Sequence, residues 1–195
     1  EVNPEDIKNH QGIIANPNCS TIQAVVALKP LHDKYKIKRI VYSTYQAVSG
    51  AGMGGYQDLE MGLKGEKPKK FPHPIAGNCL PHIDEFLPNG YTKEEMKMIN
   101  ETKKILNDYS LKITATTVRV PVFHGHSESI NVEFERDFDL DELKQTLSQA
   151  PGIIVIDNPE KLEYPMPIYA EDKDEVFVGR IRRDESVKSG VNLWV

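Results

Sequence analysis

Apolar residues recur every three or four positions in four stretches of the chain, the spacing typical of helices with one buried side. Two of these stretches follow residues that can cap a helix. Thr92 has Glu95 three positions later, which is the spacing of a capping box, and Asp139 precedes the other. Pro30 should kink or end the first helix, because proline has no N–H to donate. The predicted helices are Thr21–Tyr35, Tyr56–Leu63, Thr92 to about Tyr109, and Asp139 to about Gln149.

Six stretches rich in β-branched and aromatic residues predict strands, and in one of them Ile130, Val132 and Phe134 alternate with polar neighbours. Helices in separate blocks between short-linked strands favour an α+β fold with an antiparallel or mixed sheet covered by helices. A glycine-rich loop, Ser49–Gly55, and a proline-rich loop, Lys64–Asn89, separate these elements. The sequence stops inside an apolar strand, which suggests a piece of a longer protein. The predicted strands are Ile37–Val48, Lys112–Phe123, Ser127–Glu135, Gly152–Ile156, Glu175–Arg183 and Val191–Val195.

Composition narrows the function classes. The chain has 195 residues, 39% of them hydrophobic, which fits one domain or a tight pair with a sizeable core. Lys and Arg number 24 against 29 Asp and Glu, for a net charge of −5, so a nucleic-acid partner is not expected. The longest apolar runs are too short to span a membrane, and no signal peptide is expected. Two cysteines exclude a disulfide scaffold and favour a cytoplasmic setting.

The segment Asn16-Pro17-Asn18-Cys19-Ser20-Thr21 directly precedes the first predicted helix. Asn18, Ser20 and Thr21 are cap-type residues, so Cys19 should lie in the first helical turn or just before it. The helix dipole and the free N–H groups there would lower the pKa of the thiol and could hold an oxyanion or a phosphate. We therefore predict that Cys19 is the more reactive thiol, with a buried structural cysteine as the alternative. Cys79 lies in the proline-rich loop.

A second candidate is the stretch Val118–Ser127, where the predicted strand ends at Gly125 and His126 stands at its tip. Arg119 could present a planar, two-point contact to a carboxylate. His124 has an equal claim to the role of His126 on residue type, and spacing does not decide between them. Either histidine could instead be a structural imidazole.

Several other readings remain open from the residues alone. Glu94 and Lys97 share one helix face and could be an ordinary solvated ion pair. The Ser49–Gly55 loop matches no phosphate-binding fingerprint and could be a flexible turn. Cysteine amidases and acyltransferases would need only Cys19, His126 and an oxyanion hole. A metal site could use four residues of the proline-rich loop, namely His73, Cys79, His82 and Asp84. A non-enzymatic interaction module is a further alternative.

Four motifs in order along the chain resemble aspartate-semialdehyde dehydrogenases, most closely those of bacteria. The resemblance extends from about Ile13 to Val195, although a cysteine usual before Val118-Arg119 is Thr117 here. The related acetylglutamyl-phosphate reductases carry glycine where this chain has Asn18. The motifs are Asn16–Thr21, Tyr45–Gly52, Glu94–Lys97 and Arg119–Ser127.

The resemblance implies a role for each matching residue. Cys19 would be the acylated nucleophile, His126 the general acid/base, and Gln46 the residue that orients the thioester. Arg119 would bind the α-carboxylate of the substrate, and Glu94 its amino group. The remaining matches are Asn18 and Lys97 at the phosphate site, and Ser49 and Gly50 at the nicotinamide end of NADP.

The resemblance also implies the glyceraldehyde-3-phosphate dehydrogenase-like fold of a catalytic and dimerisation domain over residues 1–195. The reaction would interconvert aspartyl 4-phosphate and aspartate semialdehyde, with release or uptake of phosphate, in lysine, threonine and methionine biosynthesis. No strand–glycine–helix unit of a Rossmann domain occurs in the chain, and the family's closing helix is missing too. We therefore expect a homodimer that holds the nucleophile but lacks most of the NADP site and has no turnover alone.

Overall fold

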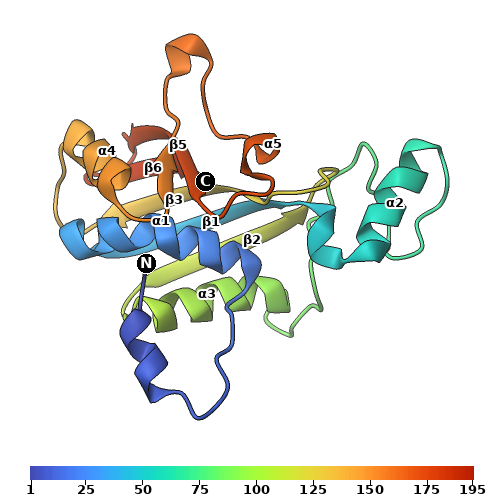
Figure 1. Cartoon of the computed structure of the whole chain (residues 1–195), viewed down its shortest axis with the longest axis horizontal. Coiled ribbons are helices and arrows are strands. Elements are labelled where there is room, and N and C mark those ends of the chain that lie inside the picture. Colours follow the sequence, from blue (N-terminus) through green and yellow to red (C-terminus); the bar gives the residue numbers. More distant parts are fainter.

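One six-stranded mixed sheet organises the chain, and α1, α3 and α4 lie on a single face of it (Figure 1). The computed structural model describes all residues, 1–195. Strands follow the order β2-β1-β3-β6-β5-β4, with β1–β2 and β4–β5 parallel and the other pairs antiparallel. The α+β prediction is confirmed. The strands are β1 (Ile37–Gln46), β2 (Lys112–Arg119), β3 (Ser127–Phe134), β4 (Ile153–Val155), β5 (Val176–Asp184) and β6 (Gly190–Trp194).

The predicted helices occur, with shifted ends. Pro30 does not end the first helix, because α1 runs through it to Tyr35, where the spacing predicts the helix to end. Leu31 and Tyr35 beyond it are buried in the core, and this burial outweighs the one missing hydrogen bond. None of the helices is long and apolar enough to cross a membrane. The helices are α1 (Cys19–Tyr35), α2 (Met53–Leu63), α3 (Lys93–Ile105), α4 (Leu140–Gln149) and α5 (Pro167–Ala170).

Two predicted ends are wrong. The helix expected to reach Tyr109 ends at Ile105, where Asn107 adopts a left-handed conformation with φ of 51° and turns the chain. The strand expected to end at Gly125 ends at Arg119, because Pro121 cannot continue the ladder, and His126 precedes β3 instead. The capping box of α3 is present, with Thr92 and Glu95 bonded reciprocally, and Asp139 caps α4.

Strand register arranges buried side chains in rows across the helix-covered face. Tyr42 and Ile130 are paired neighbours in an apolar row that continues into the main core. The next row is polar: Thr44 pairs with both Thr117 and Glu128, and all three are fully buried. Gln46 and Arg119 form the last row, at the carboxyl ends of β1 and β2. The buried face of the sheet therefore changes from apolar to polar toward the carboxyl ends of β1 and β2, where the candidate site lies.

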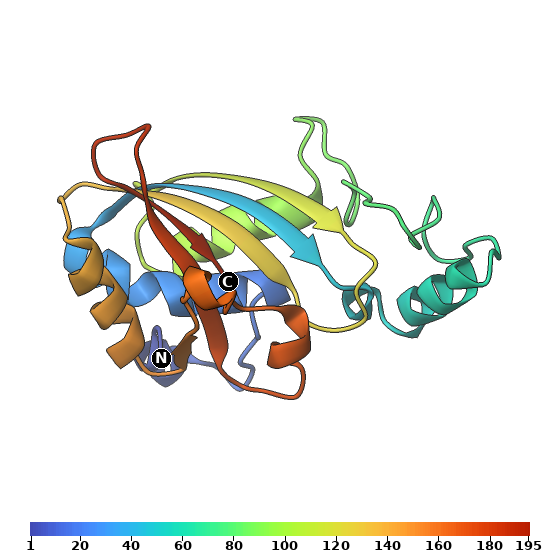
Figure 2. The ribbon, with the colours of Figure 1, turned by 90° about the horizontal axis from the view of Figure 1, so that it is seen from above.

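Two parts of the fold lie outside the helix-covered core. The arm that contains α2 projects from the end of β1 and has its own small core, in which Leu59 and Ile75 are buried (Figure 2). The second is the sheet face opposite α1, α3 and α4, which no helix covers. On that face Tyr45 and Trp194 pack with their ring centroids 5.4 Å apart, and Tyr45 is 39% exposed.

Candidate active site

Cys19 is the first residue of α1, as the cap-type neighbours predict. The side chain of Asn18 closes the helix end, where its Oδ1 accepts the N–H groups of Ser20 at 3.0 Å and Thr21 at 3.2 Å. This cap satisfies two of the four N–H groups that a helix leaves unpaired at its start. The thiol therefore lies near the carboxyl ends of β1 and β2.

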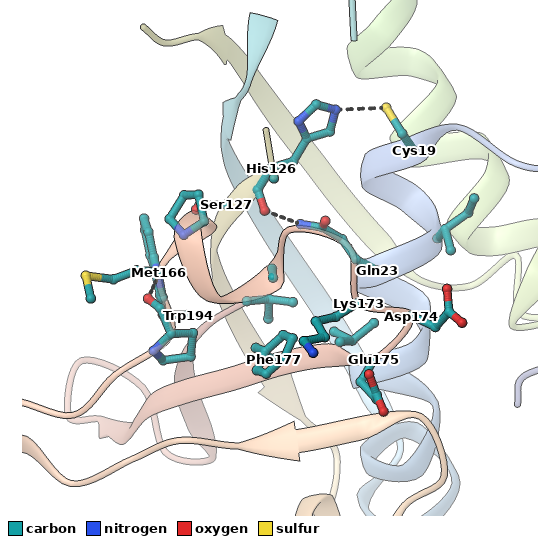
Figure 3. A pocket seen from close by; sticks show the side chains of 17 residues that line it. Cys19, Gln23, His126, Ser127, Met166, Lys173, Asp174, Glu175, Phe177 and Trp194 are labelled. Atoms are coloured by element: carbon teal, nitrogen blue, oxygen red, sulfur yellow. Dashed lines mark hydrogen bonds between the residues drawn. The ribbon is translucent and has the colours of Figure 1, made fainter. Parts of the chain in front are cut away.

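His126 faces the thiol, with its Nε2 3.2 Å from Sγ of Cys19 (Figure 3). Its Nδ1 accepts the backbone N–H of Ala47 at 3.0 Å. A neutral imidazole that accepts at Nδ1 carries its proton on Nε2, so the ring directs an N–H at the sulfur. His124 instead bonds the hydroxyl of Tyr56 at 3.1 Å and pairs with Glu171 at 3.3 Å. The structure therefore places His126, and not His124, beside the Cys19 thiol, a choice that spacing alone did not make.

Burial and the nearby Arg119 guanidinium lower the pKa of His126 to about 4, although the Glu94 carboxylate partly opposes them. A charged ring would also place an Nδ1 proton against the Ala47 N–H. The imidazole is therefore neutral at physiological pH and acts toward Cys19 as a hydrogen-bond donor.

The pKa of Cys19 contradicts the prediction of a lowered value. Desolvation of the sulfur and the Glu94 carboxylate raise it, and the Ser20 N–H and Arg119 offset them only in part. The helix start does favour the thiolate, but a nearby negative charge and partial burial outweigh it. The free protein therefore holds Cys19 as a thiol. Both cysteines are exposed at the surface, so neither is a structural core residue.

Polar side chains surround the thiol on the α3 side. Arg119 is 5% exposed, its Nη1 donates to the carbonyl of Ala47 at 2.6 Å, and its buried Nε has no partner. Oε1 of Glu94 accepts from Asn18 at 2.8 Å and from Gln46 at 3.3 Å. Lys97 lies 3.5 Å from Glu94 and 2.9 Å from Asp84. Glu94 thus connects four of the predicted residues, Asn18, Gln46, Glu94 and Lys97, whereas Arg119 bonds to the backbone of Ala47.

The glycine-rich segment is ordered. Its first part is a 3-10 turn, Val48–Ala51, that follows β1 and hydrogen-bonds to the backbone of Val122 and Phe123. Gly50 packs so closely that an added Cβ would lie 2.8 Å from Nη1 of Arg119 and 3.3 Å from the His126 ring. Only glycine fits between these two groups. Gly50 therefore borders the site, and Ser49 is its neighbour in the same turn.

A cavity of about 280 Å³ opens beside Cys19 and His126, on the side away from the Glu94 network (Figure 3). Gln23, Phe177 and Trp194 line it, and the amide of Gln23 donates to the carbonyl of His126 at 3.2 Å. Sequence reasoning did not single these residues out. Gln23 lies one helical turn after Cys19, so its spacing could have identified it. Phe177 and Trp194 come from β5 and β6, and no local signal links them to Cys19.

The alternative metal site does not form. Asp84 is ion-paired with Lys97, and the ring of His82 stacks on Phe86 with centroids 4.4 Å apart. No three His, Cys, Asp or Glu side chains gather as a ligand set anywhere in the chain.

Comparison with known proteins agrees with this geometry. Residues 28–195 match the family model for the semialdehyde dehydrogenase dimerisation domain. The whole chain is 59% identical to an aspartate-semialdehyde dehydrogenase of Aquifex aeolicus and 47% identical to one of Bacillus subtilis, and covers 60% of each. It superimposes on aspartate-semialdehyde dehydrogenase II of Vibrio cholerae with a TM-score of 0.94 and 47% identity, over 99% of this chain and 59% of that one.

The chain thus spans about 60% of the length of the relatives it matches. The family model covers most of its residues, the relatives match it from end to end, and the solved structures share its sheet and helices. The chain belongs to the semialdehyde dehydrogenase dimerisation-domain family.

Proposed function

We propose that this chain is the catalytic and dimerisation domain of an NADP-dependent aspartate-semialdehyde dehydrogenase that works through a thioester on Cys19. The observation that carries the proposal is the 3.2 Å approach of His126 Nε2 to Cys19 Sγ, next to a buried arginine and a buried glutamate. The Vibrio cholerae relative is described in complex with ASA, and a Candida albicans relative, 28% identical with a TM-score of 0.68, with NADP. The cytoplasm and the biosynthesis of lysine, threonine and methionine are the setting we propose.

Arg119 and Glu94 suit the two charged groups of an α-amino acid. The unpartnered Nε of Arg119 is a buried donor that an α-carboxylate would satisfy. Glu94 is 5% exposed, and its neighbours Asn18 and Gln46 donate to one oxygen, which orients the carboxylate toward an ammonium group. Lys97 and the remaining N–H of the Asn18 amide are the donors we assign to phosphate.

The reaction needs a sulfur nucleophile and a donor for negative charge on oxygen. The Cys19 proton first passes to solvent or to an oxygen of the bound phosphoryl group, and the resulting thiolate attacks the acyl phosphate carbon. The C–S bond forms, the C–O bond to phosphate breaks, and a thioester remains. The Nε2–H of His126 stabilises the oxyanion that forms during this attack.

Release of the aldehyde reuses the same N–H. After hydride addition, the hemithioacetal oxyanion re-forms its C=O bond and expels the Cys19 thiolate, to which His126 donates. His126 acts here as a hydrogen-bond donor, because its Nε2 already carries a proton. The resemblance alone suggested a general acid/base that moves a proton.

NADP would supply the hydride when bound. The turn of small residues, Ser49-Gly50-Ala51-Gly52, fits this role, because Gly50 leaves no side chain between the turn and His126. Ser49 and Gly50 would border the nicotinamide end.

The open face of the sheet is the surface we assign to a second copy of the chain. Tyr45 is partly exposed there, and no helix of the chain packs against this face. A sheet face that exposes aromatic side chains and has no helix over it is typical of an interface.

The test is protection of Cys19 from iodoacetamide by aspartate semialdehyde, measured by peptide mass spectrometry. We expect protection of Cys19 and unchanged labelling of Cys79 in the same molecules. Succinic semialdehyde, which lacks the amino group, should protect far less, because it offers no ammonium group to Glu94. Equal protection by both aldehydes would contradict the proposed substrate.

A further inference from the structure

The local sequence at the start of α1 supplies only one of the two side chains of a capping box. In a capping box the residue three positions after the cap returns a side-chain oxygen to the backbone N–H of the cap residue. In α3 this residue is Glu95, whose Oε2 accepts the Thr92 N–H at 2.8 Å. In α1 the equivalent residue is Thr21, whose buried hydroxyl has no partner. The N–H of Asn18 therefore needs an acceptor from elsewhere.

Glu101 supplies this acceptor from the neighbouring helix. Its Oε2 accepts the Asn18 N–H at 2.7 Å, across 83 positions of sequence. Glu101 lies seven residues after Glu94, two helical turns along α3, so both carboxylates face the start of α1. No ion pair of the chain includes Glu101, so its carboxylate is free to hold this backbone group.

The hydrogen bond between Asn18 and Glu101 follows a segment without backbone hydrogen bonds. Residues 13–17 make no backbone–backbone hydrogen bond, so Asn18 is the first residue after this segment that hydrogen bonds hold in place. Asn18 is held on three sides: by Glu101 at its backbone, by Glu94 at its amide nitrogen, and by the helix at its amide oxygen. Cys19 follows it directly.

We propose that Glu101 is a positioning residue for Cys19. From α3 it completes the cap of the helix that begins with Cys19, and so holds Sγ against Nε2 of His126. This inference rests on the proposed function only in naming Cys19 as the nucleophile. It concerns the geometry of the thiol, and its readout needs no dehydrogenase activity. If Glu101 does not position Cys19, the protection of Cys19 by aspartate semialdehyde is still expected. If the aldehyde does not protect Cys19, the role proposed for Glu101 still stands.

The experiment is a double-mutant cycle on the reactivity of the thiol. Cys19 alkylation is measured relative to Cys79 in the same molecules, with and without His126→Asn. In the parent chain, loss of the Nε2–H donor should slow Cys19 labelling by about threefold or more. Glu101→Gln keeps an oxygen acceptor, so the His126 effect should persist. In Glu101→Ala, the effect of His126→Asn on Cys19 labelling should fall to about 1.5-fold or less, because Cys19 is no longer held beside the ring.

Two further variants keep the test decisive. Glu101→Asp retains the charge and is less disruptive than alanine, but its shorter side chain does not reach Asn18, so it should behave like Glu101→Ala. Glu60→Ala, on the exposed side of α2, is the matched control and should leave the cycle unchanged. Hydrogen exchange in a peptide spanning residues 16–23 should accelerate in Glu101→Ala and Glu101→Asp only. A full His126 effect and unchanged exchange in both variants would overturn the proposal.

Discussion

Asn18 donates from its amide nitrogen to Oε1 of Glu94 at 2.8 Å, while its amide oxygen caps the helix that begins with Cys19. The nucleophile and the carboxylate that we assign to the substrate ammonium therefore share one connecting side chain. Because the Glu94 charge also raises the pKa of Cys19, the occupancy of the amino-group site and the state of the thiol are coupled.

Replacing Glu94 by Gln should lower the pKa of the Cys19 thiol. The substitution removes the negative charge that disfavours the thiolate and leaves the Ser20 N–H and Arg119, which favour it. Cys19 should therefore alkylate faster near neutral pH, with a pH midpoint below that of the parent chain. Cys79 is the internal control. A midpoint that stays or moves upward would show that Glu94 does not control the thiol.

Replacing Arg119 by Lys should weaken transition-state binding by about 1.5–3 kcal/mol. The lysine keeps the charge but loses the planar two-point contact with a carboxylate and the bond from Nη1 to Ala47. The measurement is kcat/KM with aspartate semialdehyde, phosphate and NADP, made on a polypeptide that joins this chain to the NADP-binding domain we expect. An unchanged kcat/KM would remove Arg119 from the substrate site.

Replacing Gly50 by Ala should displace Arg119 and His126, because the new methyl would lie 2.8 Å from Nη1 of Arg119. We expect a loss of about 1–3 kcal/mol in the free energy of unfolding, together with altered Cys19 labelling. Gly54→Ala is the matched control, since its methyl would meet only the flexible side chain of Lys70. Thermal melts that rank Gly50→Ala as the more stable variant would contradict this packing.

Asp108 should stabilise the fold at neutral pH and lose this effect in acid. Burial raises its pKa, but hydrogen bonds from Lys36 and Ser110 outweigh burial and bring it to about 2. Since the folded value lies below the ordinary one, the contribution is complete above the ordinary pKa and disappears as the pH falls toward 2. Asp108→Asn should cost about 1–2 kcal/mol at neutral pH, and denaturant titrations should show that most of this difference from the parent chain is lost near pH 2.

The isolated chain should fold, dimerise and show no dehydrogenase turnover. Its apolar core is complete, but Ser49 and Gly50 provide only one edge of the NADP site we propose. Light scattering should give the mass of a dimer, and absorbance at the nicotinamide band should not change with substrate, phosphate and NADP.

Two matched variants locate the dimer surface. Tyr45→Glu places a charge on the open sheet face and should yield a monomer. Tyr109→Glu, at a residue that is 72% exposed elsewhere, should not. A parent chain that is already monomeric would refute the interface, and rapid NADP reduction would reveal a cofactor site within these residues.

Local signals in the sequence determined the elements and part of the site. The capping box of Thr92 and Glu95, the Asp139 cap and the placement of Cys19 at a helix start depend on neighbours within one turn, and the structure reproduces them. The alternation of Ile130, Val132 and Phe134 likewise reports burial on one face, and all three are buried. Such features need no knowledge of the rest of the chain.

Only the tertiary structure decided which distant groups meet. β1 lies between β2 and β3, so Gln46 at the end of β1 meets Arg119 and His126, which come much later in the chain. The tertiary structure placed His126 rather than His124 beside the thiol, and desolvation of Cys19 together with the nearby Glu94 carboxylate reversed the expected shift of its pKa. Local sequence fixes dihedral preferences and burial patterns, whereas charge interactions depend on distances that only strand order and helix packing set.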